Sequence, residues 1–253
     1  AAIARHGGAR ADWLDLSTGI NPTPPRLPEL DPELWQRLPE AGLERAALAA
    51  ARRCYGAPDM AGIVAAPGTQ ALIATLPHLF APTDVAILAP TYSEHALTFA
   101  AAGHRVTRFA GLEAVSVEAR IVVVVNPNNP DGRAFEPAEL LALADRLAAR
   151  DGLLVVDEAF ADVDGARSLA PCTGRDGLLV YRSFGKFFGL AGLRLGFALT
   201  TPALAAQLGE RLGTWAVSGP ALAIGAALLG DDALVAETRA GILQQQRLLR
   251  ETI

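Results

Sequence analysis

The chain has 253 residues, of which 51% are hydrophobic and 19% charged, and its formal net charge at pH 7 is −5. A chain of this length and composition can bury a large core, which excludes disorder and favours one large domain with an appendage. The negative charge and the lack of any Lys/Arg cluster exclude nucleic acid or an anionic membrane as the main partner, because both require a concentrated basic patch.

The first forty residues predict an extended arm laid over the rest of the molecule, without helices. The reason is a series of prolines that remove backbone donors: Pro22, Pro24, Pro25, Pro28, Pro32 and Pro39.

Helices and strands alternate after the arm. Helices are predicted at 42–55, 69–80, 93–102 and 136–150, and strands at 62–66, 84–89, 104–109, 120–125, 153–156, 177–181 and 195–199. From Pro202 onward the chain is predicted to be helical, at 202–212, 220–229 and 231–251. Strands that are apolar on both faces and alternate with helices predict an α/β fold, a three-layer sandwich with a mostly parallel sheet.

Cys54 and Cys172 lie far apart and form no C-x-x-C pair. We interpret them as reduced thiols of a cytoplasmic protein, with no disulfide and no metal site. The longest apolar runs, such as IVVVV from residue 121, are too short to span a bilayer, and the first residues, AAIARHGG, lack the apolar core of a signal peptide.

The stretch 181–196, YRSFGKFFGLAGLRLG, places Lys186 in an apolar neighbourhood. Burial there lowers the pKa of the ammonium group and favours the neutral amine, which can form an imine with an aldehyde. Ser183 and Arg194 supply a hydroxyl and a planar cation, which suit a phosphate. An aldehyde that carries a phosphate is pyridoxal phosphate. Taken alone, the stretch is equally consistent with a buried turn in which Lys186 reaches solvent and Arg194 pairs with a surface acid.

In a parallel sheet, ligands bind beyond the carboxyl ends of the strands. Gly68, Thr69 and Gln70 follow the first strand and open a helix, which predicts either an anion site or an ordinary helix cap. Tyr92 follows the second strand and can stack on an electron-poor ring, although an isolated tyrosine is more often part of a core.

Two further strand ends carry polar residues. Asn129, in NPNNPDG, lies in a predicted tight turn that lets its amide donate to a phenolic oxygen. Asp157, in DEAF, can keep a pyridinium nitrogen protonated through a charge-assisted hydrogen bond.

Two other classes of protein are disfavoured by the sequence. A nucleotide hydrolase also holds magnesium at a strand that ends in Asp-Glu. However, its loop G-x-x-x-x-G-K-[ST] is absent, since Gly185-Lys186 is followed by Phe187. A non-catalytic binding module on this scaffold would tolerate loss of Lys186, whose presence with all its partners disfavours that class.

The motifs NPNNPDG, VVDEAF and SFGKFFGLAGLRLGF, in this order, resemble the fold-type I aminotransferase superfamily (classes I and II) of pyridoxal-phosphate enzymes. The similarity extends over nearly the whole chain. It implies that Lys186 carries the cofactor and that Asp157 pairs with its ring nitrogen. The remaining cofactor contacts implied are Asn129 on the phenolic oxygen, Tyr92 on the ring, and Gly68, Thr69, Gln70, Ser183 and Arg194 on the phosphate.

Within the superfamily, RHGG, LDLSTGINP and WAVSGPA look most like threonine-phosphate decarboxylases of cobalamin biosynthesis. This implies a homodimer that decarboxylates L-threonine O-3-phosphate to (R)-1-aminopropan-2-yl phosphate, with His6 and Asn21 near the substrate's phosphate. The alternative is an aminotransferase such as histidinol-phosphate aminotransferase, whose members typically read Asn-Glu-Asn-Pro where this chain has residues 19–22.

The sequence departs from this resemblance in three places. Phe160 stands where the relatives usually have tyrosine, and Leu38-Pro39 where they often have Tyr-Pro. The chain also stops before the arginine that is expected to bind the substrate carboxylate. The resemblance therefore implies an arm at 1–40, a large cofactor-binding domain at 41–215, and the helical start of a truncated small domain at 216–253.

Overall fold

The computed structural model describes residues 2–14 and 16–252. Its centre is a seven-stranded sheet with the order β1-β7-β6-β5-β4-β2-β3. β7 runs antiparallel to both of its neighbours, and the other adjacent pairs are parallel. The strands are β1 (Gly62–Ala66), β2 (Asp84–Leu88), β3 (Arg105–Phe109), β4 (Ile121–Val125), β5 (Leu153–Asp157), β6 (Leu178–Ser183) and β7 (Gly196–Thr200). The predicted mostly parallel sheet is confirmed.

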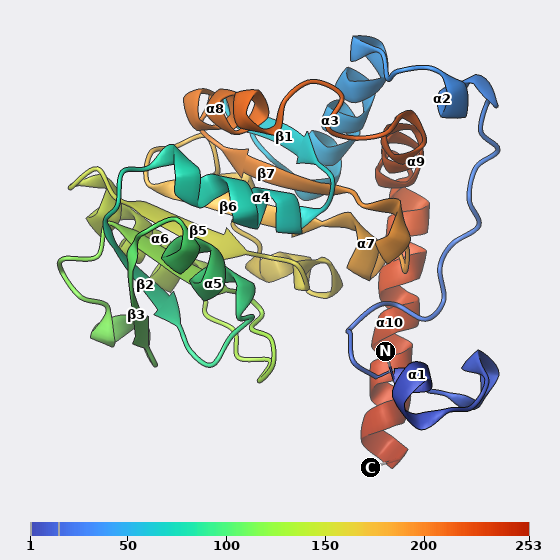
Figure 1. Cartoon of the computed structure of the whole chain (residues 1–253), viewed down its shortest axis with the longest axis horizontal. Coiled ribbons are helices and arrows are strands. Elements are labelled where there is room, and N and C mark those ends of the chain that lie inside the picture. Colours follow the sequence, from blue (N-terminus) through green and yellow to red (C-terminus); the bar gives the residue numbers. More distant parts are fainter. Residues whose placement is uncertain (1, 15, 253) are drawn as a thin grey trace.

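Helices cover both faces of the sheet, so the predicted three-layer sandwich is confirmed (Figure 1). One core lies between the sheet and α3 (Ala41–Tyr55), α6 (Pro137–Ala148) and α9 (Gly219–Leu229). The other lies between the sheet and α4 (Thr69–Thr75), α5 (Glu94–Ala101) and α8 (Pro202–Leu212). Strands β4 and β5 are buried along their whole length, which explains why they read as continuous apolar runs.

Short helical turns connect the main elements. η2 (Leu76–Leu79) continues α4, so the predicted helix 69–80 changes type near Pro77, which has no backbone N–H for an α-helical hydrogen bond. α7 (Phe184–Phe187) follows β6 directly. The remaining turns are η3 (Leu112–Ala114), η4 (Ala161–Val163), η5 (Gly165–Arg167), η6 (Ala170–Cys172) and η7 (Ala191–Leu193).

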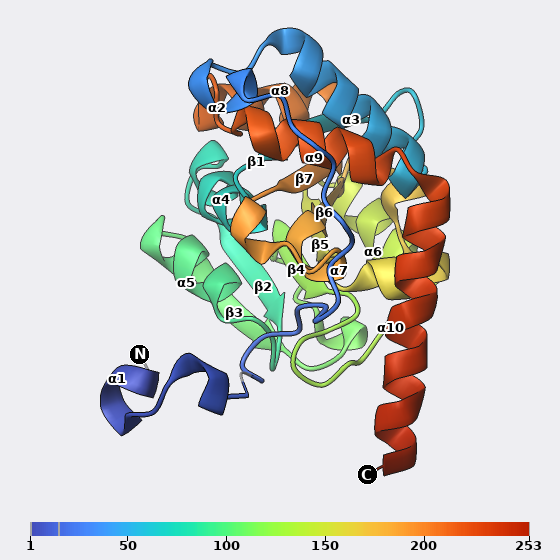
Figure 2. The ribbon, with the colours of Figure 1, turned by 90° about the vertical axis from the view of Figure 1, so that its right-hand side faces the viewer.

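The arm is not free of helices, and that prediction was wrong in part. It contains α1 (Ala2–His6), η1 (Arg10–Asp12) and α2 (Glu33–Gln36). None of these segments contains proline, and Pro32 lies at the N-cap of α2, where a missing N–H has little effect. Between η1 and α2, the described residues 13–14 and 16–32 contain no helix or strand, and this proline-rich part passes in front of α7 (Figure 2).

The carboxyl-terminal helices differ in their surroundings. α9 packs on α3 and contributes Ala221, Leu222 and Ile224 to the core. α10 (Asp232–Thr252) runs away from the sandwich, and Leu248 and Leu249 near its end are exposed (Figure 1). Within residues 2–14 and 16–252, no single helix is long and apolar enough to cross a membrane. α9 and α10 reach that length and hydropathy only as a pair bent by 83°.

Candidate active site

A cavity of about 450 Å³ lies at the carboxyl ends of β4, β5 and β6. It brings together every residue that the sequence predicted to contact the cofactor: Gly68, Thr69, Gln70, Tyr92, Asn129, Asp157, Ser183, Lys186 and Arg194. These residues come from five separate segments, so only the topology of the sheet places them in one cavity. The arm closes one side of it with residues 16–20.

Lys186 lies on α7 and is the only lysine in the 253 residues. Burial lowers the pKa of its ammonium group, and the nearby charge of Asp157 offsets part of that effect. Its Nζ lies 4.2 Å from the ring centroid of Phe160. A lowered pKa increases the fraction of neutral amine, which is the form that can attack an aldehyde.

Asp157 ends β5 and is almost fully buried. Burial alone would raise the pKa of its carboxyl group, but the hydrogen bond and charge of His95, followed by the charge of Lys186, lower it. Oδ2 lies 3.0 Å from Nε2 of His95, and Oδ1 accepts from the N–H of Ala159 at 3.0 Å. A carboxylate has further lone pairs, so Asp157 can still accept a hydrogen bond from a protonated nitrogen placed in the cavity.

His95 was not predicted as a site residue. It lies three residues after Tyr92 on α5, and its ring is 6.1 Å from the Tyr92 ring at an interplanar angle of 87°. The sequence does show this histidine in the segment PTYSEH that follows a strand. Nothing in that segment indicates that the histidine faces a carboxylate 62 positions later.

Gly68 and Arg194 form the end of the cavity that suits an anion. A Cβ added at Gly68 would lie 2.5 Å from Nη2 of Arg194, so only glycine lets the guanidinium approach the backbone there. Arg194 has φ = 56°, and its Nη1 donates to the carbonyl oxygen of Ala191 at 3.0 Å. A Cβ at Gly196 would lie 2.6 Å from the backbone nitrogen of Thr69, so β7 passes close to the start of α4. The result is a narrow cradle of N–H and guanidinium groups.

Tyr92 and Gln70 are connected to each other. The Tyr92 hydroxyl donates to Oε1 of Gln70 at 3.2 Å, and Nε2 of Gln70 donates to Oε2 of Glu94 at 2.9 Å. Burial, and then the charges of Glu94 and Asp157, raise the pKa of Tyr92. The tyrosine is therefore neutral at physiological pH and lies at the mouth of the cavity, with 41% of its surface exposed.

The loop NPNNPDG presents Asn129 through the bonds of its neighbours. Asn128 donates to the carbonyl oxygen of Pro90 at 2.9 Å and accepts from Thr91 at 2.7 Å. Asn126 accepts from the N–H of Phe135 at 2.8 Å. Both side chains therefore hold the loop, whereas Asn129 lines the cavity.

The structure does not bring the two predicted substrate residues into this cavity. His6 is exposed on α1, with its ring 6.2 Å from that of Trp13. Asn21 is buried and lies beside a second, smaller cavity of about 230 Å³. Gly19 and Phe160 were not predicted as site residues, and both line the two cavities.

The comparisons with known proteins agree with this geometry. The family model described as "Aminotransferase class I and II" matches residues 12–253. A threonine-phosphate decarboxylase from Sinorhizobium sp is 50% identical over 97% of this chain and 73% of its own length. A histidinol-phosphate aminotransferase from Geotalea daltonii is 31% identical over 94% of this chain and 71% of its own. Among solved structures, the histidinol-phosphate aminotransferase from Sinorhizobium meliloti in complex with pyridoxal-5'-phosphate has a TM-score of 0.74 and 26% identity, covering 86% of this chain and 63% of that one.

Proposed function

Because the chain belongs to the class I and II aminotransferase family, we propose that it is a pyridoxal-phosphate enzyme that decarboxylates L-threonine O-3-phosphate to (R)-1-aminopropan-2-yl phosphate, a step of cobalamin biosynthesis. One observation carries the proposal. The only lysine of the chain is half-buried in the same cavity as a buried carboxylate, beside a glycine that admits an arginine at close range. The higher identity to the decarboxylase, 50% against 31%, favours decarboxylation over amino transfer.

The residues present fit pyridoxal phosphate. The cradle at Gly68 and Arg194 suits its phosphate, and Lys186 suits its aldehyde. Asp157 suits its ring nitrogen, since a buried carboxylate with a lowered pKa stays ionised and accepts a hydrogen bond. Asn129 can donate to its phenolic oxygen, and the ring of Phe160 offers no second donor there.

When bound, pyridoxal phosphate supplies an electron sink for the pair of electrons left on the substrate's α carbon after carbon dioxide departs. Asp157 would keep the proton on the ring nitrogen, and His95 keeps the carboxylate of Asp157 oriented and ionised. Lys186 would hold the cofactor through its aldehyde. When its Nζ is free and protonated, it would be the group that delivers a proton to the α carbon.

The choice between decarboxylation and amino transfer depends on substrate orientation. The bond that breaks is the one held perpendicular to the cofactor ring, so a decarboxylase must hold the carboxylate in that position. Gly19 and Phe160 line both cavities and therefore limit how a substrate can enter. The alternative function is that of an aminotransferase such as histidinol-phosphate aminotransferase.

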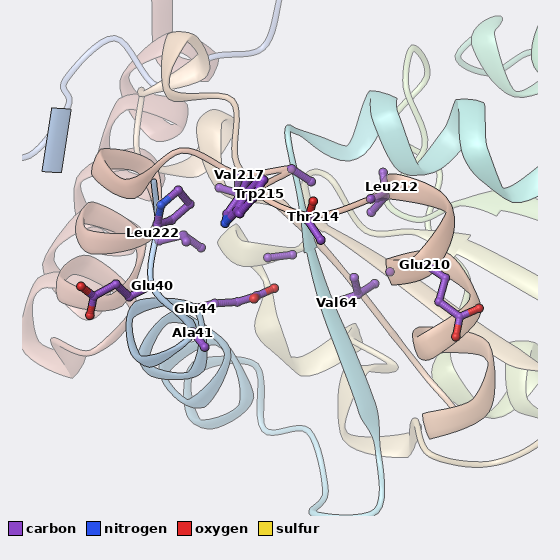
Figure 3. A pocket seen from close by; sticks show the side chains of 15 residues that line it. Glu40, Ala41, Glu44, Val64, Glu210, Leu212, Thr214, Trp215, Val217 and Leu222 are labelled. Atoms are coloured by element: carbon purple, nitrogen blue, oxygen red, sulfur yellow. The ribbon is translucent and has the colours of Figure 1, made fainter. Parts of the chain in front are cut away.

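We extend the proposal to a homodimer. Trp35, Leu38 and Trp215 are exposed by 70%, 61% and 60%. Trp215 borders a hollow of about 440 Å³ (Figure 3), which shares Pro39 and Glu40 with a neighbouring hollow of about 480 Å³. A second copy of the chain placed on this face would remove these side chains from water. Light scattering should then give twice the mass of the chain.

We also propose a cytoplasmic location. The proposed ligand is a small phosphorylated amino acid, and neither nucleic acid nor a membrane is a proposed partner. Support comes from the net charge of −5 and from Cys54 and Cys172, both free thiols. Burial raises the pKa of Cys54 to about 11, so this thiol stays protonated and unreactive at neutral pH.

The test is incubation of the purified protein with pyridoxal phosphate and L-threonine O-3-phosphate. Release of carbon dioxide together with the phosphorylated amino alcohol, dependent on the cofactor, is the expected result. Amino transfer from histidinol phosphate to an α-keto acid, with no carbon dioxide from threonine phosphate, would support the aminotransferase in its place.

A further inference from the structure

The arm crosses the turn that carries Lys186 at a segment we name the strap, residues 19–24. The N–H of Asn21 donates to the carbonyl oxygen of Lys186 at 3.0 Å, and its Nδ2 donates to that of Phe187 at 3.0 Å. α7 has only four residues, so these carbonyls lie at its C-terminal end, where no later turn of helix can satisfy them. Within the turn, the carbonyl oxygen of Lys186 also accepts from the N–H of Phe188 at the helix cap and from the N–H of Gly189 at 3.4 Å. Asn21 therefore completes the hydrogen bonding of the turn.

The oxygen of the Asn21 side-chain amide also has hydrogen-bond partners. Its Oδ1 accepts from the N–H of Thr23 at 3.0 Å and from the Thr23 hydroxyl at 2.9 Å. Oγ1 of Thr23 in turn accepts from Nε2 of Gln245 on α10 at 3.2 Å. Asn21 is 8% exposed and does not line the larger cavity. A continuous set of hydrogen bonds thus connects α10, the strap and the end of α7.

The strap also packs closely against the turn that carries Lys186. Gly189 has φ = 68°, and a Cβ there would lie 2.5 Å from the carbonyl oxygen of Asn21. Two residues earlier on the strap, a Cβ at Gly19 would lie 2.8 Å from the ring of Phe160. That ring lies against the Lys186 amine. The strap therefore contacts both the backbone that carries Lys186 and the aromatic ring that covers its amine.

We propose that Asn21 is a positioning residue for Lys186, holding the amine in the cavity through the backbone of α7, and that it is not a ligand of the substrate. Loss of the Asn21 side-chain amide leaves the Phe187 carbonyl without its donor, while the backbone N–H of Asn21 still reaches Lys186. The loosened turn then lets the amine move toward water. A more hydrated amine is protonated more easily and is a poorer nucleophile. The inference rests on the proposed function only where its test uses the cofactor.

Lys186 can be followed without any cofactor because it is the only lysine. Acylation of the cofactor-free protein by an amine reagent, at a mildly alkaline pH and with peptide mass spectrometry, reports the fraction of neutral amine. In Asn21→Ala we expect this acylation to slow by about two- to twelvefold, as for loss of one net hydrogen bond. In Asn21→Asp, which keeps the acceptor for Thr23 but loses the donor to Phe187, the same direction is expected.

The cofactor gives a second measurement. After reduction with borohydride, less pyridoxal phosphate should be fixed to Lys186 in Asn21→Ala than in the parent, while the KM for substrate stays nearly constant and kcat falls. Thr23→Val and Gln245→Ala should have smaller effects in the same direction. Gln244→Ala is the matched control, because Gln244 is exposed on the same helix and lines neither cavity.

Unchanged acylation and unchanged fixation in a folded Asn21→Ala protein would overturn the inference. So would a raised KM with unchanged acylation, since that result makes Asn21 a substrate ligand. If Asn21→Ala does not fold, Thr23→Val decides: slower acylation supports positioning, and acylation at the parent's rate contradicts it. A parent that fixes no cofactor would refute the proposed function and leave the acylation test standing.

Discussion

Replacing Asp157 with asparagine should reduce turnover far more than it reduces stability. The carboxylate is 3% exposed, so solvent screens its charge little. Two of its acceptor positions are taken by His95 and Ala159, and the remaining lone pairs are available to a cationic ring nitrogen. For the pair between Asp157 and a cationic ring nitrogen, we use the about 3–5 kcal/mol that is typical of losing one partner of a buried charged pair; asparagine still offers an acceptor to His95, so the fold loses less. At about 1.36 kcal/mol per tenfold in rate, kcat should fall by about 150- to 5,000-fold.

The assay is single-turnover release of carbon dioxide from L-threonine O-3-phosphate at saturating cofactor. Glu158→Gln is the matched control, because Glu158 is the next residue and its carboxylate lies on the other face of the sheet, 2.7 Å from Nη1 of Arg182. We expect Glu158→Gln to lose stability but to keep turnover within a few-fold of the parent. Turnover of Asp157→Asn within a few-fold of the parent, or equal losses in the two variants, would refute the role given to Asp157.

Three further predictions concern the energetics of the site and of its support. Burial lowers the pKa of Lys186, so between that pKa and the ordinary value of about 10.4 the unfolded chain binds more protons and stability rises with pH. Lys186→Met should therefore unfold at higher urea than the cofactor-free parent at neutral pH, with the difference shrinking as pH approaches 10. A difference in urea midpoint that stays constant as the pH rises would contradict the lowered pKa of Lys186. Arg182→Met leaves the buried carboxylates of Glu158 and Asp162 without their cation and should lower the free energy of unfolding by about 3–5 kcal/mol, whereas a loss under about 1 kcal/mol would contradict this role of Arg182. In Gly68→Ala the added Cβ collides with the Arg194 guanidinium, and alanine must adopt φ near 83°, which costs about 1–2 kcal/mol. A fluorescence titration should therefore show weaker cofactor binding. Equal affinity would place the phosphate elsewhere.

Much of the fold could be predicted because buried strands leave a simple pattern in the sequence. The strand predicted at 62–66 has the observed bounds, and the other strands begin within one residue of their predicted positions. The antiparallel direction of β7 could not be predicted, since hydrophobic runs carry no information about strand direction. The short helices of the arm were not predicted, because the many prolines between residues 22 and 39 indicate an extended chain and helices of three to five residues leave no periodic pattern.

The candidate site could be predicted where a residue follows a strand directly, as Asp157 does. His95 and Phe160 depend on packing between segments that are distant in sequence. His95 reaches Asp157 only because α5 covers the sheet beside the end of β5. Phe160 meets Gly19 only because the arm crosses the cavity. The sequence shows these residues but not their neighbours.

Lys186 is the proposed point of cofactor attachment, and borohydride reduction followed by peptide mapping tests this role directly. The 253 residues contain no other lysine, so apart from the amino terminus no competing primary amine is present. We predict that the protein incubated with pyridoxal phosphate and reduced carries one label, on the peptide that contains Lys186, and that Lys186→Met carries none. An unlabelled Lys186 peptide, or equal labelling of the parent and Lys186→Met, would contradict the account.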